Sequence, residues 1–279
     1  MSHISPFGSY NFGSFQSNDR ELTRLERQAT VAWPIERARL LEVGLKPDMR
    51  ILDLACGPGF ISRLIAAELG PEGEVVGIDL NDGLLEIAAA TAAEWNALPE
   101  RSNLSFYKAD AYRLDLPDDS FDLVYARFLF QHLARPLDAM AEIRRALKPG
   151  GRLLIADVDD AVFNILPELP GLTPMMEIAA AAQSERGGDR RIGRKLPHYL
   201  KRAGFEDVTT DIEVISSDDI GLEAFIEITS RFKIELLPER HRATAQRVFD
   251  GIRSDRLDPS TYAHAGVYAV SGRVPTHPL

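Results

Sequence analysis

Short apolar segments alternate with stretches of helical periodicity over most of the chain. Runs of β-branched and leucine residues bounded by turns predict strands near residues 50–54, 74–79, 104–108, 121–126, 151–157, 208–215 and 266–273. The stretches between them often show the apolar spacing of a helix, as in residues 195–205, where Gly204 ends the pattern. This alternation predicts an α/β fold in which a mostly parallel sheet is covered by helices on both faces.

The segment before the first strand predicts an N-terminal arm. Residues 1–18 are rich in glycine, serine and aromatic side chains, which fits either a disordered arm or a lid that folds over a ligand. Residues 19–43 repeat apolar positions at helical spacing and predict helices interrupted at Pro34. We therefore expect residues 1–43 to form a lid on a domain that comprises residues 44–279.

Two later segments are too long to be simple connections between predicted elements. We expect residues 160–194 to cap a pocket, with Phe163, Met175 and Met176 as its apolar lining. Residues 217–262 are expected to be mostly helical, and either structural packing or pocket building would explain them.

The sequence ILDLACGPGF, residues 51–60, is the most informative local pattern. An apolar strand ends near Asp53, and Gly57 and Gly59 let the backbone bend sharply and approach a ligand closely. Residues 60–69 continue with the apolar spacing of one helix face. This order favours a nucleotide-like ligand, although a turn that only packs a helix tightly on a strand would give the same pattern.

A second acidic residue follows at an informative distance. GEVVGIDLN, residues 73–81, predicts a strand that ends in Asp79, about 20 residues after the glycines, where a Rossmann-like fold places the carboxylate that accepts hydrogen bonds from ribose hydroxyls. The phosphate-binding patterns GxxxxGKS/T and GxGxxG are both missing. The ligand is therefore expected to carry a ribose without depending on a phosphate site.

These residues resemble motif I of the class I S-adenosylmethionine-dependent methyltransferases, an acidic residue followed by GxGxG. Asp79 matches that family's ribose-binding acid, whereas Ala55 departs from the pattern because it stands where the first glycine usually is. Residues 106–133 and 143–159 resemble the later motifs, so the similarity covers roughly residues 40–215. The resemblance implies a Rossmann-like, seven-stranded, mostly parallel sheet with an antiparallel last strand, to which this chain adds its N-terminal helical arm and helical cap insertions.

The resemblance assigns the methionine part of S-adenosylmethionine to the glycine turn. The side chain of Asp53 and the backbone of the turn, at Ala55, Cys56, Gly57 and Gly59, would hold it. The thiol of Cys56 is better explained as a small buried apolar side chain than as a nucleophile.

The same resemblance assigns the nucleoside part to the next strand ends. Asp79 would accept both ribose hydroxyls, Leu80 would flank the adenine, Asp110 would accept the adenine amino group, and Ala111 would contribute a backbone contact. Asp110 also precedes AYRL and would fit a helix N-cap. Arg127 would contact the methionine carboxylate or form a salt bridge with a surface acid.

Methyl transfer from a sulfonium depends mainly on positioning and on the exclusion of water. A general base is required only where the acceptor must lose a proton. The candidates are His132, Tyr10 and Asp157, with Asp159 as a neighbouring alternative. His132 lies in an apolar stretch, where a structural histidine is the more common interpretation.

Composition limits the partners. The 279 residues include 32 basic and 42 acidic side chains, a net charge of −10, which argues against a broad nucleic-acid surface. The basic residues near position 190 are expected on a solvated face; they are Arg190, Arg191, Arg194 and Lys195. A single cysteine and scattered histidines exclude an internal disulfide and predict no metal site. We also expect no membrane span and a cytoplasmic location, because neither a long apolar run nor a signal segment is present.

The sequence therefore predicts a methyltransferase that converts S-adenosylmethionine to S-adenosylhomocysteine and methylates a small apolar or mixed-polarity acceptor. Segments such as LKPGG resemble those of the ubiquinone and menaquinone C-methyltransferases and of natural-product methyltransferases, which favours a quinone precursor or a secondary metabolite. A protein of the same fold that binds the cofactor but performs cyclisation is the main alternative. A nucleic-acid or protein methyltransferase fits less well, and the N-terminal arm is a candidate contact for a homo-oligomer.

Overall fold

The computed structural model describes residues 18–98, 100–251 and 258–276. Residues 1–17 of the arm predicted at residues 1–18, among them Tyr10, lie outside these described residues, as does that part of the proposed oligomer contact. The strands are β1 Arg50–Leu54, β2 Glu74–Asp79, β3 Asn103–Lys108, β4 Phe121–Arg127, β5 Leu147–Val158, β6 Asn164–Leu166, β7 Glu206–Ser216 and β8 Tyr262–Arg273. The helices are α1 Asn18–Glu42, α2 Phe60–Ala66, α3 Asp82–Asn96, α4 Pro136–Ala146, α5 Leu172–Ser184, α6 Leu196–Arg202, α7 Ser217–Ile220, α8 Leu222–Thr229 and α9 Glu239–Gly251. The 3₁₀ segments are η1 Phe130–His132, η2 Asp160–Val162, η3 Gly193–Lys195 and η4 Arg231–Leu236.

The strands form one sheet in the order β3-β2-β1-β4-β5-β8-β6, and β7 pairs with the other edge of β8. Strands β1 to β5 pair in parallel, whereas β8 is antiparallel to β5, β6 and β7. The predicted α/β fold is confirmed, and each of the seven predicted strands is present. The short strand β6 was not predicted: β8 extends beyond the end of β5, and Asn164–Leu166 pair with the part of its edge that β5 leaves free.

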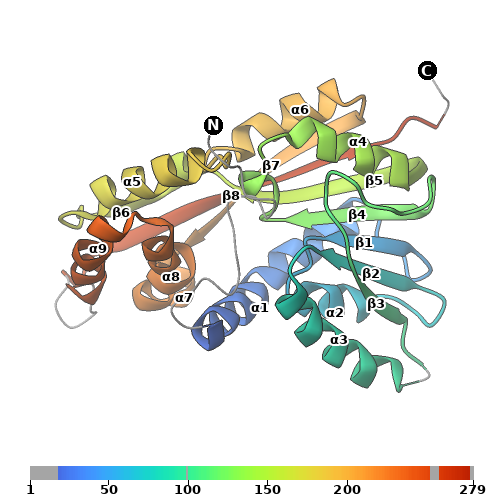
Figure 1. Ribbon diagram of the computed structural model, residues 1–279, viewed down its shortest axis with the longest axis horizontal. Coiled ribbons are helices and arrows are strands. Elements are labelled where there is room, and N and C mark those ends of the chain that lie inside the picture. Colours follow the sequence, from blue (N-terminus) through green and yellow to red (C-terminus); the bar gives the residue numbers. More distant parts are fainter. Residues whose placement is uncertain (1–17, 99, 252–257, 277–279) are drawn as a thin grey trace.

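Helices cover both faces of the sheet, as the figures show. In Figure 1, α4 and α6 lie above the sheet, and α1, α2 and α3 lie below it. Successive strand residues point to opposite faces, so neighbours on one strand feed different cores. Leu52 and Val124 pack in the core under α4 and α6, whereas Ile51 and Leu123 pack in the core with α1, α2 and α3.

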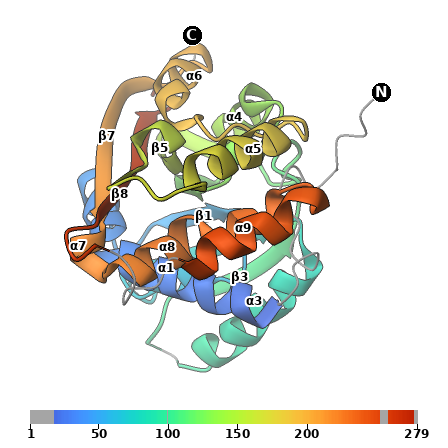
Figure 2. The same cartoon turned by 90° about the vertical axis from the view of Figure 1, so that its left-hand side faces the viewer.

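The two predicted insertions pack together as one cap. A third apolar cluster joins β6 and α5 from the first insertion to α8, η4 and α9 from the second. Figure 2 views the molecule from this end, where α5, α8 and α9 lie close together. Phe163 lines the cavity as predicted, but Met175 is buried in this cluster and Met176 packs against it, so the predicted places of the two methionines in the pocket lining are wrong. The apolar face of α5 packs against the other helices of the cap instead of facing the cavity.

Helix α1 is continuous from Asn18 to Glu42 and includes Pro34, so the predicted interruption is also wrong. A proline inside a helix removes one backbone hydrogen bond, which tertiary packing must offset. Ala29 and Leu40, on either side of Pro34, are both buried in the core beside the sheet. These contacts hold both halves of the helix on the same surface.

A buried ion pair fastens α1 to the sheet. Nε of Arg127, at the end of β4, donates to Oε1 of Glu36 at 2.6 Å, and both side chains are nearly fully buried, at 10% and 8% exposure. Arg127 also donates to the backbone carbonyl of Gln28, one α1 position closer to the N-terminus of the chain than Ala29. The helix is therefore held by a charge contact at the carboxyl end of a central strand.

The glycine turn uses a left-handed backbone at three positions. The φ angles are 63° at Ala55, 56° at Gly57 and 77° at Gly59. A Cβ at Gly59 would lie 2.6 Å from the ring of Phe106, which explains why a glycine is needed there. Ala55 instead carries the steric cost of a side chain in this conformation.

We predict that Ala55→Gly stabilises the protein. The substitution removes left-handed strain of about 1–2 kcal/mol but adds freedom to the unfolded chain, which leaves a net gain of about 0.5–1 kcal/mol. Thermal unfolding should then shift upward by about 2 °C. Gly59→Ala is the matched change in the opposite direction and should lower the unfolding temperature, because it adds strain and displaces Phe106. An Ala55→Gly variant less stable than the parent would show that the turn is not strained.

We predict that Glu36→Ala lowers the free energy of unfolding by about 3 kcal/mol or more, since it strands the buried charge of Arg127. Denaturant unfolding monitored by circular dichroism measures this loss. Arg37→Ala, one residue further along the helix, removes a solvent-exposed pair with Glu68 and should have no measurable effect. The double variant Glu36→Leu/Arg127→Met should recover most of the stability, because it removes both charges. Equal losses for Glu36→Ala and Arg37→Ala would contradict the anchoring role of the pair.

Candidate active site

A cavity of about 320 Å³ lies at the carboxyl ends of the parallel strands, between α1 and the cap. The predicted cofactor residues that line it are Asp53, Ala55, Cys56, Gly57, Asp79, Leu80, Asp110, Ala111 and Arg127. Gly59 does not line the cavity, because it faces Phe106 behind the turn. One structural feature therefore brings together side chains that the sequence placed on four separate strand ends.

Asp79 fastens the glycine turn to the end of β2. Its Oδ2 accepts a hydrogen bond from the backbone N–H of Gly57 at 2.9 Å, and its Oδ1 accepts one from the N–H of Asn81 at 2.9 Å. Burial raises the pKa of the Asp79 carboxyl, and the backbone donors oppose that rise. The carboxylate that the sequence assigned to a ribose also shapes the turn beside it.

The carboxyl of Asp53 is buried, and its pKa lies near neutral pH. Burial raises its pKa to about 7, and the hydrogen bond from Ser62 Oγ to its Oδ2, at 2.5 Å, and the charge of Arg127 partly oppose the rise. Because Asp53 lines the cavity, its charge state depends on what is bound there.

Two sequence interpretations of neighbouring residues need correction. Oδ1 of Asp110 accepts from the backbone N–H of Tyr112 at 2.9 Å within a turn, and no helix begins there, so the alternative of a helix N-cap is wrong. Arg127 pairs with an acid, but Glu36 is buried rather than at the surface. Burial, and after it the charge of Glu36, raises the pKa of the Tyr125 hydroxyl beside this pair.

Cys56 fits its predicted packing role. The residue is buried, and burial raises the pKa of its thiol well above the ordinary range. Its backbone N–H donates to the carbonyl of Ile78 at 2.9 Å. A thiol held neutral in this way is a poor nucleophile.

Of the described candidates for a general base, His132 and Asp157 are unsuited to that role, whereas Asp159 lines the cavity with its carboxylate paired to Arg194. His132 lines the cavity, but burial, with the charges of Arg190 and Arg186, lowers its pKa to about 3, so it is neutral and weakly basic at pH 7. Asp157 does not line the cavity. Its carboxylate accepts hydrogen bonds from the backbone N–H groups of Gln131 and Val158, so its assignment as a base is a prediction that the structure contradicts.

The cap contributes charged residues that the sequence analysis did not assign to the site. Asp160, Arg190 and Lys233 line the cavity, and Arg190 and Lys233 are buried, at 6% and 1% exposure. Arg190 was expected on a solvated face, and this expectation is wrong because it forms an ion pair with Asp160. No local pattern marks these residues; the only sequence signal is that Asp160 closely follows a predicted strand end.

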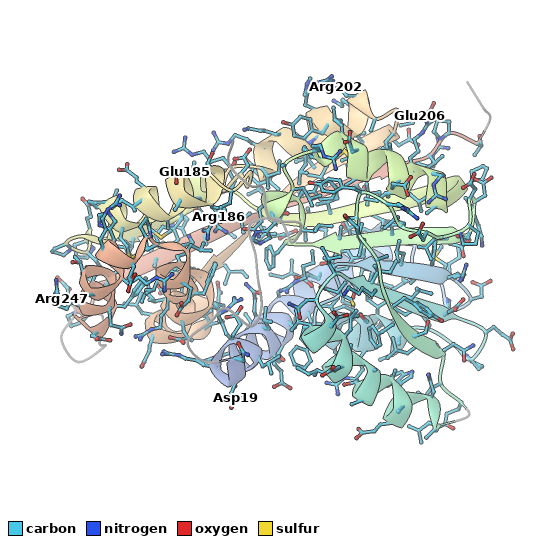
Figure 3. All side chains as sticks on the ribbon, viewed as in Figure 1. Asp19, Glu185, Arg186, Arg202, Glu206 and Arg247 are labelled. Carbon is cyan, nitrogen blue, oxygen red and sulfur yellow. The ribbon has the colours of Figure 1, made fainter. Side chains whose placement is uncertain are left out.

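The buried charges stand apart from the ordinary surface charges. In Figure 3 the labelled residues Asp19, Glu185, Arg202, Glu206 and Arg247 lie at the periphery of the ribbon, and each is exposed. Within the described ranges, no group of three or more histidine, cysteine, aspartate and glutamate side chains is arranged to hold a metal ion. None of the described helices is both long and apolar enough to cross a membrane.

Comparisons with known proteins agree with this geometry. Residues 45–204, more than half of the chain, match a family described as a methyltransferase domain. Over 114 residues the chain is 38% identical to the ubiquinone/menaquinone biosynthesis C-methyltransferase UbiE of Ectopseudomonas mendocina, an alignment that covers 41% of this chain and 43% of that protein. The chain spans about half the length of the curated relatives it matches.

Solved structures show the same fold at low identity. The [4+2]-cyclase SpnF is 23% identical with a TM-score of 0.59, over 88% of this chain and 81% of that chain. Phosphoethanolamine N-methyltransferase 2 of Haemonchus contortus, in complex with S-adenosyl-L-methionine, is 21% identical with a TM-score of 0.57, over 87% and 53%. Because the matched segment contains the glycine turn, Asp79 and Asp110 and extends over more than half of the chain, the chain belongs to the methyltransferase domain family, as a class I S-adenosylmethionine-dependent methyltransferase.

Proposed function

We propose that this protein transfers the methyl group of S-adenosylmethionine to a small acceptor held between the strand ends and the cap. The observation that carries the proposal is that one cavity is lined both by the family's cofactor motifs and by cap residues such as Phe163 and Phe232. The cavity wall is mostly apolar, with a few charged side chains, which is typical of a site for a small organic ligand.

The residues present fit the cofactor. A Cβ built at Gly57 would meet no atom within 4 Å, so the backbone of the turn is open to a ligand. Asp53 and Asp79 present carboxylates at two adjacent strand ends, which suits a ligand with an ammonium group and ribose hydroxyls. We assign Asp53 and the turn to the methionine part, Asp79 and Leu80 to the ribose and its surroundings, and Asp110 to the adenine.

The protein's contribution to the reaction is positioning and desolvation. The bound cofactor supplies a methyl group activated by a positively charged sulfur. Helix α1 lines one side of the cavity with apolar side chains, including Leu25, Ala32 and Ile35, and thereby limits the access of water. The paired charges of Glu36 and Arg127 hold that helix in place. We accordingly propose that the described part of the segment 1–43 acts as a lid on the domain 44–279.

The acceptor is proposed to be a quinone precursor or a secondary metabolite. The aromatic side chains Phe128, Phe163 and Phe232 line the cavity and suit a flat ring. The similarity to a quinone C-methyltransferase points in the same direction. The principal alternative is a protein that binds the cofactor but catalyses a cyclisation and transfers no methyl group. The [4+2]-cyclase SpnF has the same fold as this chain.

We predict methyl transfer to at least one member of a panel of phenols, hydroxyquinones, indoles and amines. Incubation with methyl-labelled S-adenosylmethionine, followed by chromatography of labelled product, tests this. Asp79→Ala is the matched control; it should weaken cofactor binding about 10- to 100-fold in calorimetry, since hydrogen bonds to a charged group contribute about 1.5–3 kcal/mol. Tight cofactor binding with no transfer to any acceptor would favour the cyclase alternative. Unchanged binding by Asp79→Ala would overturn the ribose assignment.

We predict that cofactor affinity decreases as the pH is lowered through 7. The pKa of Asp53 is raised to about 7, so its carboxylate is progressively protonated below that pH and loses its attraction for the cationic ligand. Calorimetric titrations should show a decline of about tenfold per pH unit well below 7. Asp53→Asn should bind weakly and without this slope. Asp157→Asn is the matched control, because its carboxyl also has a pKa of about 7 but lies outside the cavity wall. An Asp53→Asn protein that retains the slope would exclude Asp53 as its source.

A further inference from the structure

Lys233 is a buried cation on the wall of the cavity. The side chain, in η4 of the cap, is 1% exposed. Its Nζ lies 3.3 and 3.2 Å from Oδ1 and Oδ2 of Asp160 and 3.5 Å from Sδ of Met176. Lysine is rarely buried to this degree unless it is well paired, and both contacts to Asp160 are longer than the 2.7–2.9 Å usual for a charge-assisted hydrogen bond.

The stronger partner of Asp160 is Arg190. Its Nη2 donates to Oδ1 at 2.7 Å and its Nε donates to Oδ2 at 2.9 Å, so that both carboxylate oxygens are engaged by one guanidinium. Arg190 also donates through Nη1 to Oε1 of Gln131. The single negative charge of Asp160 therefore faces two cations, and Lys233 is the less well satisfied of the two.

The neighbouring acids are engaged by other groups: the carboxylate of Asp157 accepts backbone hydrogen bonds from Gln131 and Val158, although the charge of Arg190 also acts on it. Arg24 on α1 is paired with Glu21, and the buried carboxylate of Asp159 is paired with Arg194. Arg186, another cation of the described part of the cap, does not line the cavity and donates to backbone carbonyls of α5 and η4. Among the described ion pairs, Lys233 therefore has only the shared carboxylate of Asp160 opposite it, in a region shielded from water.

The surroundings of Lys233 are aromatic. Its Nζ lies 5.6 Å from the ring centre of Phe163, and the ring of Phe232, the preceding residue, is stacked by the guanidinium groups of Arg24 at 4.6 Å and Arg190 at 5.9 Å. A buried cation beside aromatic rings suits a flat ligand that carries a negatively charged oxygen. Burial lowers the pKa of Lys233 to about 7, and Asp160 only partly opposes this shift, so an additional anion would stabilise the ammonium.

We propose that Lys233 binds the ionised hydroxyl oxygen of a phenolic or hydroxyquinone-type acceptor and so selects acceptors of this class. This inference rests on the proposed methyl transfer and specifies its substrate. An uncharged Lys233 reaches the same complex by taking the hydroxyl proton: the O–H bond breaks, an N–H bond forms, and a phenolate remains opposite an ammonium. Lys233 lies outside the residues 45–204 that match the family, so this selection belongs to the cap.

A chromogenic phenol tests the inference directly. We would titrate 4-nitrophenol, whose phenolate is yellow, against the protein with and without S-adenosylhomocysteine. The wild-type protein is expected to bind the probe as its phenolate, with the apparent pKa of the bound probe lowered by about one unit or more. Lys233→Met should bind the probe at least about tenfold more weakly and without that lowering.

Control variants separate charge at this position from charge elsewhere. Lys195→Met removes the same charge from a pair with Asp189 that does not line the cavity, and it should bind the probe like the wild type. Lys233→Arg retains the charge and should retain part of the pKa shift. Lys233→Met should fold with an unfolding temperature no lower than that of the wild type, because Asp160 keeps its two bonds from Arg190 and methionine suits the apolar surroundings.

Two results would overturn the inference: phenolate binding by Lys233→Met equal to that of the wild type, or no lowering of the probe's pKa in the wild type. Failure of the proposed function gives a different result. In that case cofactor binding or methyl transfer fails across the whole panel, while the probe titration without S-adenosylhomocysteine still decides the role of Lys233. Transfer to phenols and amines that is equally efficient in the wild type and in Lys233→Met would leave methyl transfer in place and exclude this selection.

Discussion

The parallel pairing of β1 with β2 on one side and with β4 on the other is the constraint on which the site depends. The chain leaves the centre of the sheet in opposite directions on the two sides, so no connection passes over the carboxyl end of β1. The turn after β1 must enter α2 at once, which requires the left-handed backbone at Ala55, Gly57 and Gly59. The opening that remains receives Asp53 and Asp79 because both stand at strand ends on that edge.

Such an opening must be covered before it can exclude water, and in this protein the covers are fixed by buried charges. Glu36 and Arg127 join α1 to β4, and Asp160 joins Arg190 and Lys233. Buried ion pairs give little net stability compared with well-packed apolar residues, since both charges lose their hydration. These buried pairs lie around one cavity, whereas the exposed pair of Arg37 lies elsewhere, a distribution that fits a role at the site better than a role in stability alone.

Much of the core and of the cofactor side could be predicted from the sequence because the signals there are local. Strands buried on both faces read as apolar runs, and Asp53, Asp79 and the glycines lie within short motifs. Several of the errors share a physical cause, which is contact between distant segments. Helix α1 continues through Pro34 because both of its halves pack on the sheet. Strand β6 forms because β8 is long enough to pair with it beyond the end of β5. The ion pair of Lys233 with Asp160 joins residues 73 positions apart. Neither apolar periodicity nor a motif reports such contacts.

The charged residues that join the two segments of the cap also form part of the cavity wall. Asp160 and Arg190 belong to the first insertion and Lys233 to the second, so one charge cluster both joins the two segments and lines the cavity. Because the carboxylate of Asp160 already accepts two hydrogen bonds from Arg190, it neutralises the charge of Lys233 only partly. An anionic oxygen from a ligand would complete that neutralisation and hold the two insertions more firmly. Under this proposal, the interaction that binds the acceptor also joins the two insertions, which gives a physical reason for a costly buried lysine where an apolar side chain would pack more easily.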